Sequence, residues 1–80
     1  MHEWHITEEL LEIVCNQAEV NKLKKVNKIE VALGKDSDIT EDSIRFCLES
    51  LSQETIASGA VLHIIPREGN DLILVSIEGE

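Results

Sequence analysis

Apolar residues recur at helical spacing in two segments of the chain, and these segments predict two amphipathic helices. The first runs from about Thr7 to Leu23 and the second from about Thr40 to Glu54. In the second segment the apolar residues fall at i, i+3, i+4 and i+7, which is the strongest helical signal in the sequence. The predicted buried faces are Leu10, Leu11, Val14, Cys15 and Ala18 in the first helix, and Ile44, Cys47, Leu48 and Leu51 in the second.

The two predicted helices share a start signal. Ile6-Thr7-Glu8-Glu9 precedes the first apolar face, and Ile39-Thr40-Glu41-Asp42 precedes the second. A threonine hydroxyl can accept a hydrogen bond from a free backbone N–H of the first turn, and carboxylates after it suit the positive end of the helix dipole. We therefore expect Thr7 and Thr40 to be the N-cap residues.

Three shorter segments are typical of β-strands. Lys28–Leu33 alternates between polar and apolar residues, and Ala60–Ile65 and Leu72–Ile77 are largely apolar. The last two segments are separated by a short, turn-rich link, Pro66–Asp71. Such a link predicts that they form an antiparallel hairpin closed around Gly69-Asn70.

The predicted fold is α+β, with the elements in the order α-β-α-β-β. A three-stranded sheet with two helices on one face would bury the apolar residues of all five elements. Pro66 has no N–H to donate, so it belongs at the end of a strand or on an edge. The strand residues expected to face the helices are Ile29, Val31, Leu33, Leu62, Ile64, Ile73, Val75 and Ile77.

The composition restricts the classes of partner. The 80 residues are enough for one small domain, residues 1–80, with a thin core. Seven Lys and Arg against 16 Asp and Glu give a net charge of −9, which repels nucleic acid and anionic lipid and favours cations and basic surfaces. Because the sequence shows neither a transmembrane segment nor a signal peptide, we expect a cytoplasmic protein without membrane association.

Most reactive side chains have an ordinary structural interpretation. Cys15 and Cys47 lie on the predicted apolar helix faces and outside any CxxC pair, which predicts reduced, buried, metal-free thiols rather than a redox pair or metal ligands. Asp36 and Asp38 are expected to be solvated loop charges, and His63 an outward-facing or hydrogen-bonded strand residue. No nucleophile motif, phosphate-binding glycine loop or HExxH is present, so we expect a protein that is not an enzyme.

The first five residues, Met-His-Glu-Trp-His, concentrate metal-binding groups at the N-terminus. A free α-amine on Met1, the imidazole of His2 and the amide nitrogen between them can form fused chelate rings around one metal ion. Planar arrays of nitrogen donors suit Ni(II) and Cu(II). Glu3 adds another amide nitrogen, and His5 is a further candidate ligand. The opposing interpretation is a frayed terminus with two chance histidines.

This opening, leading directly into an amphipathic helix, resembles the HypA family of hydrogenase-maturation nickel chaperones. The similarity covers essentially the whole chain, and its order and spacing are more specific than any single piece. The other matching features are Glu9–Val14, Lys25–Val31, Gly34, Phe46, Thr55–Ala60, Leu62 and Ser76–Glu78.

The resemblance implies a function. Ni(II) would be bound transiently by the amine of Met1, the imidazole and backbone nitrogen of His2 and the backbone nitrogen of Glu3. It would then be delivered to the nickel site of [NiFe]-hydrogenase. The implied partners are an accessory GTPase of the HypB type and the hydrogenase large subunit.

One departure from the family is large. The family normally inserts a zinc-binding module with two CxxC pairs between its last two strands. Here no such module is present between Ile65 and Leu72, and neither cysteine lies in that link. A closed zinc site needs four ligands at such spacing, so we expect no zinc.

Two other functions remain open at this stage. One is a protein-interaction module that keeps the same fold but has lost metal delivery, and that binds through its acidic surface or an open sheet edge. The other is a small regulatory domain that binds a small molecule, for which the sequence indicates no pocket residues.

Overall fold

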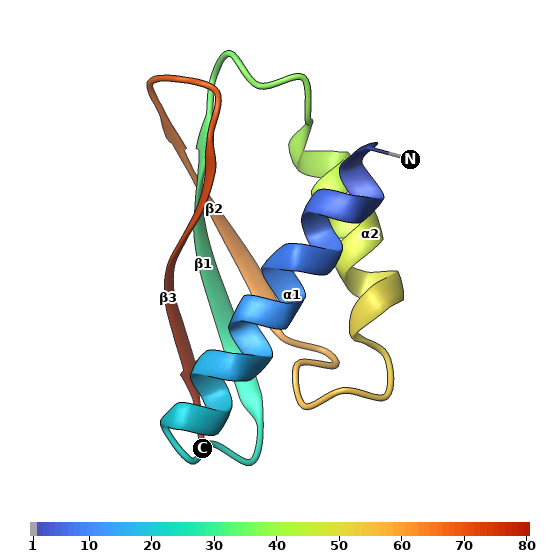
Figure 1. The fold of residues 1–80 in the computed structure, drawn as a ribbon, viewed down its shortest axis with the longest axis vertical. Coiled ribbons are helices and arrows are strands. Elements are labelled where there is room, and N and C mark those ends of the chain that lie inside the picture. Colours follow the sequence, from blue (N-terminus) through green and yellow to red (C-terminus); the bar gives the residue numbers. More distant parts are fainter. Residues whose placement is uncertain (1) are drawn as a thin grey trace.

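Two helices lie on one side of a three-stranded sheet (Figure 1). The computed structural model describes residues 2–80. The elements are α1 (His2–Val20), β1 (Val26–Gly34), α2 (Glu41–Ser52), β2 (Val61–Arg67) and β3 (Leu72–Gly79). The predicted α+β class, the order α-β-α-β-β and the two helices on one face are confirmed. None of the described helices is both long and apolar enough to cross a membrane.

The predicted C-terminal hairpin is wrong. The strand order is β2-β1-β3, so the last two strands flank β1 and do not pair with each other. β1 pairs in parallel with β2, from Lys28↔Val61 to Gly34↔Arg67. It pairs in antiparallel with β3, from Val26↔Gly79 to Leu33↔Leu72. β1 is the most buried strand. Its central position pairs both of its edges with neighbouring strands, and its inner face packs against the helices.

The link between β2 and β3 passes across the carboxyl end of β1. Its backbone accepts hydrogen bonds there: Gly34 N–H donates to the Asp71 carbonyl (2.7 Å) and Asp36 N–H to the Gly69 carbonyl (2.9 Å). Residues 68–71 are sufficient because two strand spacings amount to about 10 Å. At Gly34 a Cβ would lie 2.3 Å from the Gly69 oxygen, so this crossing requires glycine. A short, turn-rich link therefore did not imply a hairpin.

The buried face of β3 also differs from the prediction. Ile73 and Val75 are 38% and 51% exposed, whereas Leu72, Leu74 and Ile77 pack against the core. The register with β1 shifts between the Glu30↔Ser76 and Val31↔Leu74 pairs. An extra residue at such a bulge moves the preceding side chains to the opposite face, which explains why simple alternation failed before Ser76.

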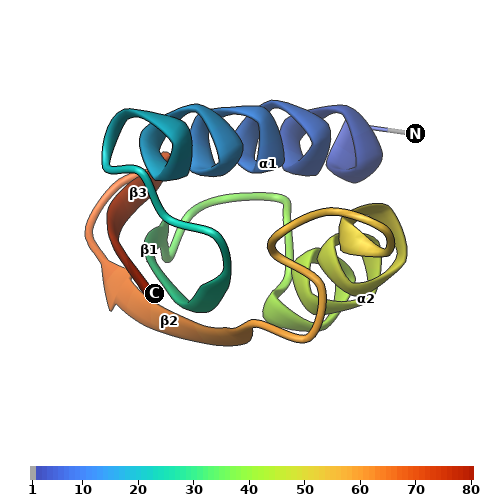
Figure 2. The same ribbon diagram turned by 90° about the horizontal axis from the view of Figure 1, so that it is seen from below.

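Both helices contribute to the same core. The largest fully buried apolar side chains include Val14 from α1, Ile29 and Val31 from β1 and Ile44 from α2. Seen from below, the sheet curves around this core while α1 and α2 close the remaining sides (Figure 2). Pro66 lies in β2, which is an edge strand as expected.

Only one of the two predicted helix caps is confirmed. Thr40 is the N-cap of α2, and its hydroxyl oxygen accepts a hydrogen bond from Ser43 N–H (3.1 Å). The N-cap prediction for Thr7 is wrong because α1 begins at His2. Thr7 lies inside the helix, fully buried, and its hydroxyl donates to the Glu3 carbonyl (2.7 Å).

The two cysteines have different surroundings. Cys47 is buried, as predicted, whereas Cys15 is only partly buried and packs at the margin of the core, so the predicted full burial of Cys15 is wrong. Both thiols are free. Burial raises the pKa of the Cys15 thiol above its ordinary value.

Candidate metal centre

The predicted site residues lie at the start of α1. Met1 lies outside the residues that the structure describes, whereas His2 and Glu3 are the first two residues of α1. The His2 side chain is exposed and that of Glu3 is half-buried. The structure thus places the His2 imidazole and the Glu3 backbone nitrogen on one helical turn.

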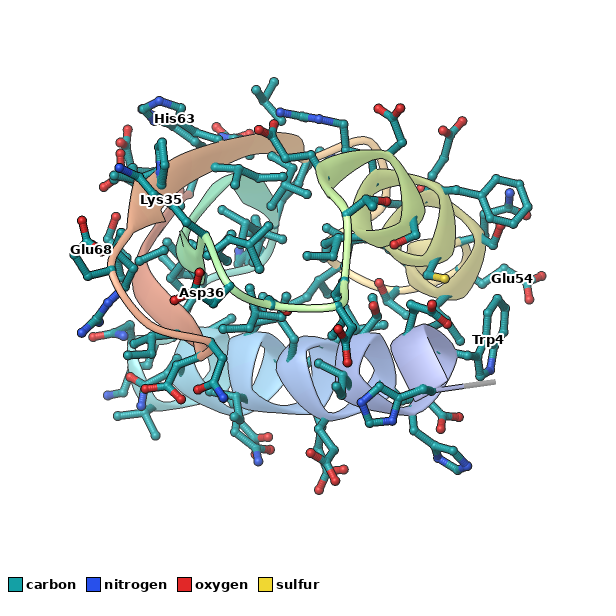
Figure 3. The ribbon with its side chains drawn as sticks, turned by 90° about the horizontal axis from the view of Figure 1, so that it is seen from above. Trp4, Lys35, Asp36, Glu54, His63 and Glu68 are labelled. Atoms are coloured by element: carbon teal, nitrogen blue, oxygen red, sulfur yellow. The ribbon has the colours of Figure 1, made fainter. Side chains whose placement is uncertain are left out.

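Three side chains hold this first turn against the rest of the molecule. Trp4 and Ile6 are half-buried, and Ile6 packs against the hydrophobic core. The buried Thr7 hydroxyl ties the second turn to the Glu3 carbonyl. Figure 3 shows Trp4 extending from the start of α1 on the side of the molecule where α2 lies. These contacts explain why the helix continues upstream of Thr7.

His2 borders a shallow hollow of 190 Å³. The hollow lies between the start of α1, the loop that joins β1 to α2, and the link between β2 and β3. It is lined by His2, Ile6, Asp36, Ser37, Asp38, Ile39 and Asn70. Two exposed carboxylates therefore lie near His2, although 34 or more residues separate them from it in the sequence.

The loop beside this hollow is fixed by a small number of contacts. Lys35 Nζ lies 3.9 Å from Glu68 Oε1, and Ile39 N–H donates to the Ser37 hydroxyl (3.1 Å). Figure 3 shows Lys35, Asp36 and Glu68 on neighbouring loops at one end of the molecule. The loop after β1 is therefore positioned by the link between β2 and β3. The periodicity of the sequence does not reveal this contact.

The first turn of a helix leaves its backbone N–H groups without intrahelical acceptors. The amide nitrogens of His2 and Glu3 are in this class, so using them as ligands breaks no helical hydrogen bond. Across residues 2–80, no three side chains of His, Cys, Asp or Glu are grouped so that they could hold a metal ion. What the first turn offers is a combination of main-chain nitrogen and imidazole.

His63 has the surroundings that the sequence interpretation gave it. It is exposed on the sheet face opposite the helices, and its Nδ1 lies 2.9 Å from Glu30 Oε2. The Ser76 hydroxyl donates to Glu30 Oε1 at 3.4 Å. The three residues are neighbours across β2, β1 and β3, a juxtaposition that follows from the strand order. Figure 3 shows His63 far from Trp4 and the start of α1.

Comparison with known proteins decides the family. The family model described as "Hydrogenase/urease nickel incorporation, metallochaperone, hypA" matches residues 1–71. The chain belongs to the HypA family. A hydrogenase maturation factor HypA from Dehalococcoides mccartyi (strain CBDB1) is 48% identical over 62 residues, covering 78% of this chain and 52% of the relative. Another HypA, from Thermococcus kodakarensis, is 32% identical over 68 residues, covering 85% and 49%.

Solved HypA structures share the fold. A solution structure titled as HypA protein superposes with a TM-score of 0.84 at 17% identity, covering 100% of this chain and 97% of that one. The Ni metallochaperone HypA from Helicobacter pylori superposes with a TM-score of 0.76 at 16% identity, covering 92% and 70%. The chain spans about half the length of the curated HypA relatives that it matches.

Proposed function

We propose that this chain carries Ni(II) at its Met1-His2-Glu3 terminus and supports nickel incorporation during [NiFe]-hydrogenase maturation. The observation that carries this proposal is the position of His2 and Glu3 on the first helical turn, with the His2 side chain exposed, in a chain of the HypA family. Its role is that of a carrier, with the metal as cargo and no bond made or broken in a substrate.

The chemistry of the donors suits a planar site. The Met1 amine, the His2 imidazole and the amide nitrogens of His2 and Glu3 supply four nitrogen donors, which Ni(II) accepts in square-planar geometry. The amine and the amides must lose protons to bind, so affinity should rise with pH.

The electrostatics of the first turn contain two opposing effects. The positive end of the helix dipole, equivalent to about half a charge, opposes a cation placed there. Deprotonated amide ligands reverse this local charge when the metal binds. The net charge of −9 and the nearby Asp36 and Asp38 add further attraction for a divalent cation.

The proposed partners follow from the family. They are an accessory GTPase of the HypB type and the hydrogenase large subunit, which would receive the nickel. The link between β2 and β3, residues 68–71, contains no cysteine, so the proposal includes no zinc site between Ile65 and Leu72.

Calorimetric titration of untagged protein with Ni²⁺ tests the proposal. His2→Ala should abolish tight binding, because it removes the imidazole. Glu3→Ala keeps its backbone nitrogen and should cost less. A residue added before Met1 should also weaken binding, because it converts the α-amine into an amide. His63→Ala, which removes a distant exposed histidine, is the matched control and should bind like the native chain. Native affinity in the His2→Ala protein would disprove the chelate.

The alternative function is a protein-interaction module of the same fold that has lost metal delivery. The observation in its favour is the sheet face opposite the helices, where Val61 and Val75 are 64% and 51% exposed. Exposed apolar groups on one surface are typical of contact sites. A folded chain with no measurable Ni²⁺ binding would favour this alternative.

A further inference from the structure

His5 lies on the first two turns of α1, beside the proposed chelate, and the proposed function gives it no role. His2, His5 and Glu8 follow one another at intervals of three residues on this helix. Residues i and i+3 of a helix are neighbours on its surface, about 5–6 Å apart between Cβ atoms. Ligand pairs at this spacing bind metals in helical carboxylate proteins. The three side chains are exposed.

The direction of helical side chains adds to this arrangement. Each Cα–Cβ bond of a helix tilts toward the N-terminus, so a side chain covers the turn that precedes it. His5 therefore leans toward the turn that contains His2 and Glu3. The main chain of His5 is one helical turn beyond the proposed chelate, within the reach of an imidazole side chain.

Glu8 presents a carboxylate to one nitrogen of the His5 ring. Oε1 of Glu8 lies 3.5 Å from Nδ1 of His5, and the His5 side chain is 79% exposed. In metal sites, a histidine commonly uses one ring nitrogen for the metal and turns the other to a carboxylate, which fixes the ring and raises its basicity. With Nδ1 facing Glu8, the solvent-exposed Nε2 is the nitrogen available to a metal.

We propose that His5, oriented by Glu8, is an additional ligand for the nickel bound at the N-terminus. The inference rests on the proposed function, because the metal must first be held by the first turn. In the proposed chelate the four nitrogen donors would lie in one plane and would leave both faces of Ni(II) open. The His5 imidazole approaches from one face and raises the coordination number.

This additional ligand gives the carrier a way to release its cargo. Square-planar Ni(II) is diamagnetic, and binding an axial imidazole converts it to a paramagnetic, higher-coordinate ion with longer bonds to the planar donors. These longer, weaker bonds are replaced by the ligands of a receiving protein more readily than the short bonds of the planar ion. His5 would thus hold nickel in a form ready for transfer.

The test compares Ni²⁺-loaded, untagged native protein with His5→Ala. NMR magnetic susceptibility and X-ray absorption report the paramagnetic fraction and the number of imidazole ligands. The native protein should show a paramagnetic fraction and two imidazoles per nickel. His5→Ala should be diamagnetic with one imidazole, and should release nickel to a chelator several-fold more slowly. Glu8→Gln should reduce the paramagnetic fraction without abolishing it.

Matched controls separate the site from general surface effects. His63→Ala removes an exposed histidine that also faces a carboxylate, and Glu12→Gln removes an exposed glutamate one turn further along α1. Both should match the native protein. Circular dichroism should be unchanged in all four variants because each residue is exposed.

The outcomes distinguish this inference from the proposed function. If His2→Ala abolishes binding while His5→Ala has the native magnetic moment and imidazole count, the His5 ligand is refuted and the nickel carrier stands. If His2→Ala binds nickel as tightly as the native chain, the carrier model fails and the His5 proposal fails with it.

Discussion

Two segments of this chain carry almost the same four residues and fold differently. Ile39-Thr40-Glu41-Asp42 begins α2, with the Thr40 hydroxyl accepting from a first-turn N–H. Ile6-Thr7-Glu8-Glu9 lies inside α1, with the Thr7 hydroxyl donating backward to the Glu3 carbonyl. A threonine in the same local sequence is thus a hydrogen-bond acceptor at a helix start and a donor in a helix interior.

The difference is set by the residues upstream. Before Thr40 the chain comes from a polar loop, and Thr40 itself has extended backbone angles (φ −95°, ψ 158°). Before Thr7, the half-buried Trp4 and Ile6 are placed on the inner side of a continuing helix. The local signal marks where a helix can begin, and packing of the preceding turn decides whether it does.

Proline substitution at the residue after each threonine should give the largest contrast. Glu41→Pro replaces the first residue of α2, where proline is tolerated, and Thr40 already has the extended conformation that precedes proline. Glu8→Pro removes an N–H in the interior of α1 and should reduce the free energy of unfolding by about 3 kcal/mol. Urea denaturation followed by circular dichroism measures both.

The opposite ranking would overturn the assignment of the α1 start. If Glu8→Pro were as stable as Glu41→Pro, Thr7 would be the true cap and residues 2–6 would not be helical. Nickel binding by the Glu8→Pro protein then shows whether the chelate needs a helical first turn.

Matched Thr→Val substitutions should give a smaller difference in unfolding free energy. Removing the capping hydroxyl of Thr40 should destabilise the protein more than removing the interior hydroxyl of Thr7. Thr40→Val leaves a first-turn N–H without its cap and should cost about 1 kcal/mol of unfolding free energy. Thr7→Val keeps the buried shape and removes only a donor to a carbonyl that already belongs to the helical ladder, so it should cost roughly 0.5 kcal/mol or less. Thermal or urea denaturation checks the order, and equal losses would contradict it.

The cysteines of the two helices should differ in their rates of reaction with a thiol reagent. Cys15 should react slowly with a thiol reagent in native buffer, and Cys47 only after unfolding, because it is buried. Burial raises the pKa of Cys15, so its reaction rate should continue to rise at pH values above the ordinary pKa of a thiol. Mass spectrometry of labelled peptides measures both rates.

The sign of the pH effect on stability follows from the same shift. The folded state holds the Cys15 proton more tightly than the unfolded state, because burial raises the pKa of this thiol. The resulting contribution to the free energy of unfolding is fully present below the ordinary thiol pKa. It is lost as pH rises through the raised value. Cys15→Ala should therefore lose less stability than the native chain on going to alkaline pH. An identical alkaline loss in both proteins would contradict this assignment.

The sequence predicted the candidate metal residues but not their setting. Met1, His2 and Glu3 were proposed from donor chemistry and from the resemblance to the HypA family, and their role as ligands stays a prediction. The hollow that brings Asp36, Asp38 and Asn70 near His2 was not predicted, because it depends on a loop and a link that are distant in sequence. The contact between His5 and Glu8 was within reach of the sequence, since i, i+3 spacing on a helix predicts it.

By itself the sequence determined the five elements, their order and the apolar stripes of the two helices. These follow from local periodicity, which is independent of the rest of the fold. Only the tertiary structure decided which strands pair. The link after Arg67 is long enough to cross β1, and burial of the apolar β1 favours its central position between β2 and β3. It also decided the inner face of β3, where a bulge reverses the alternation, and the start of α1, where packing of Trp4 and Ile6 outweighs the capping signal at Thr7. In each case the deciding energy is burial against residues that are far away in the sequence, which no local pattern contains.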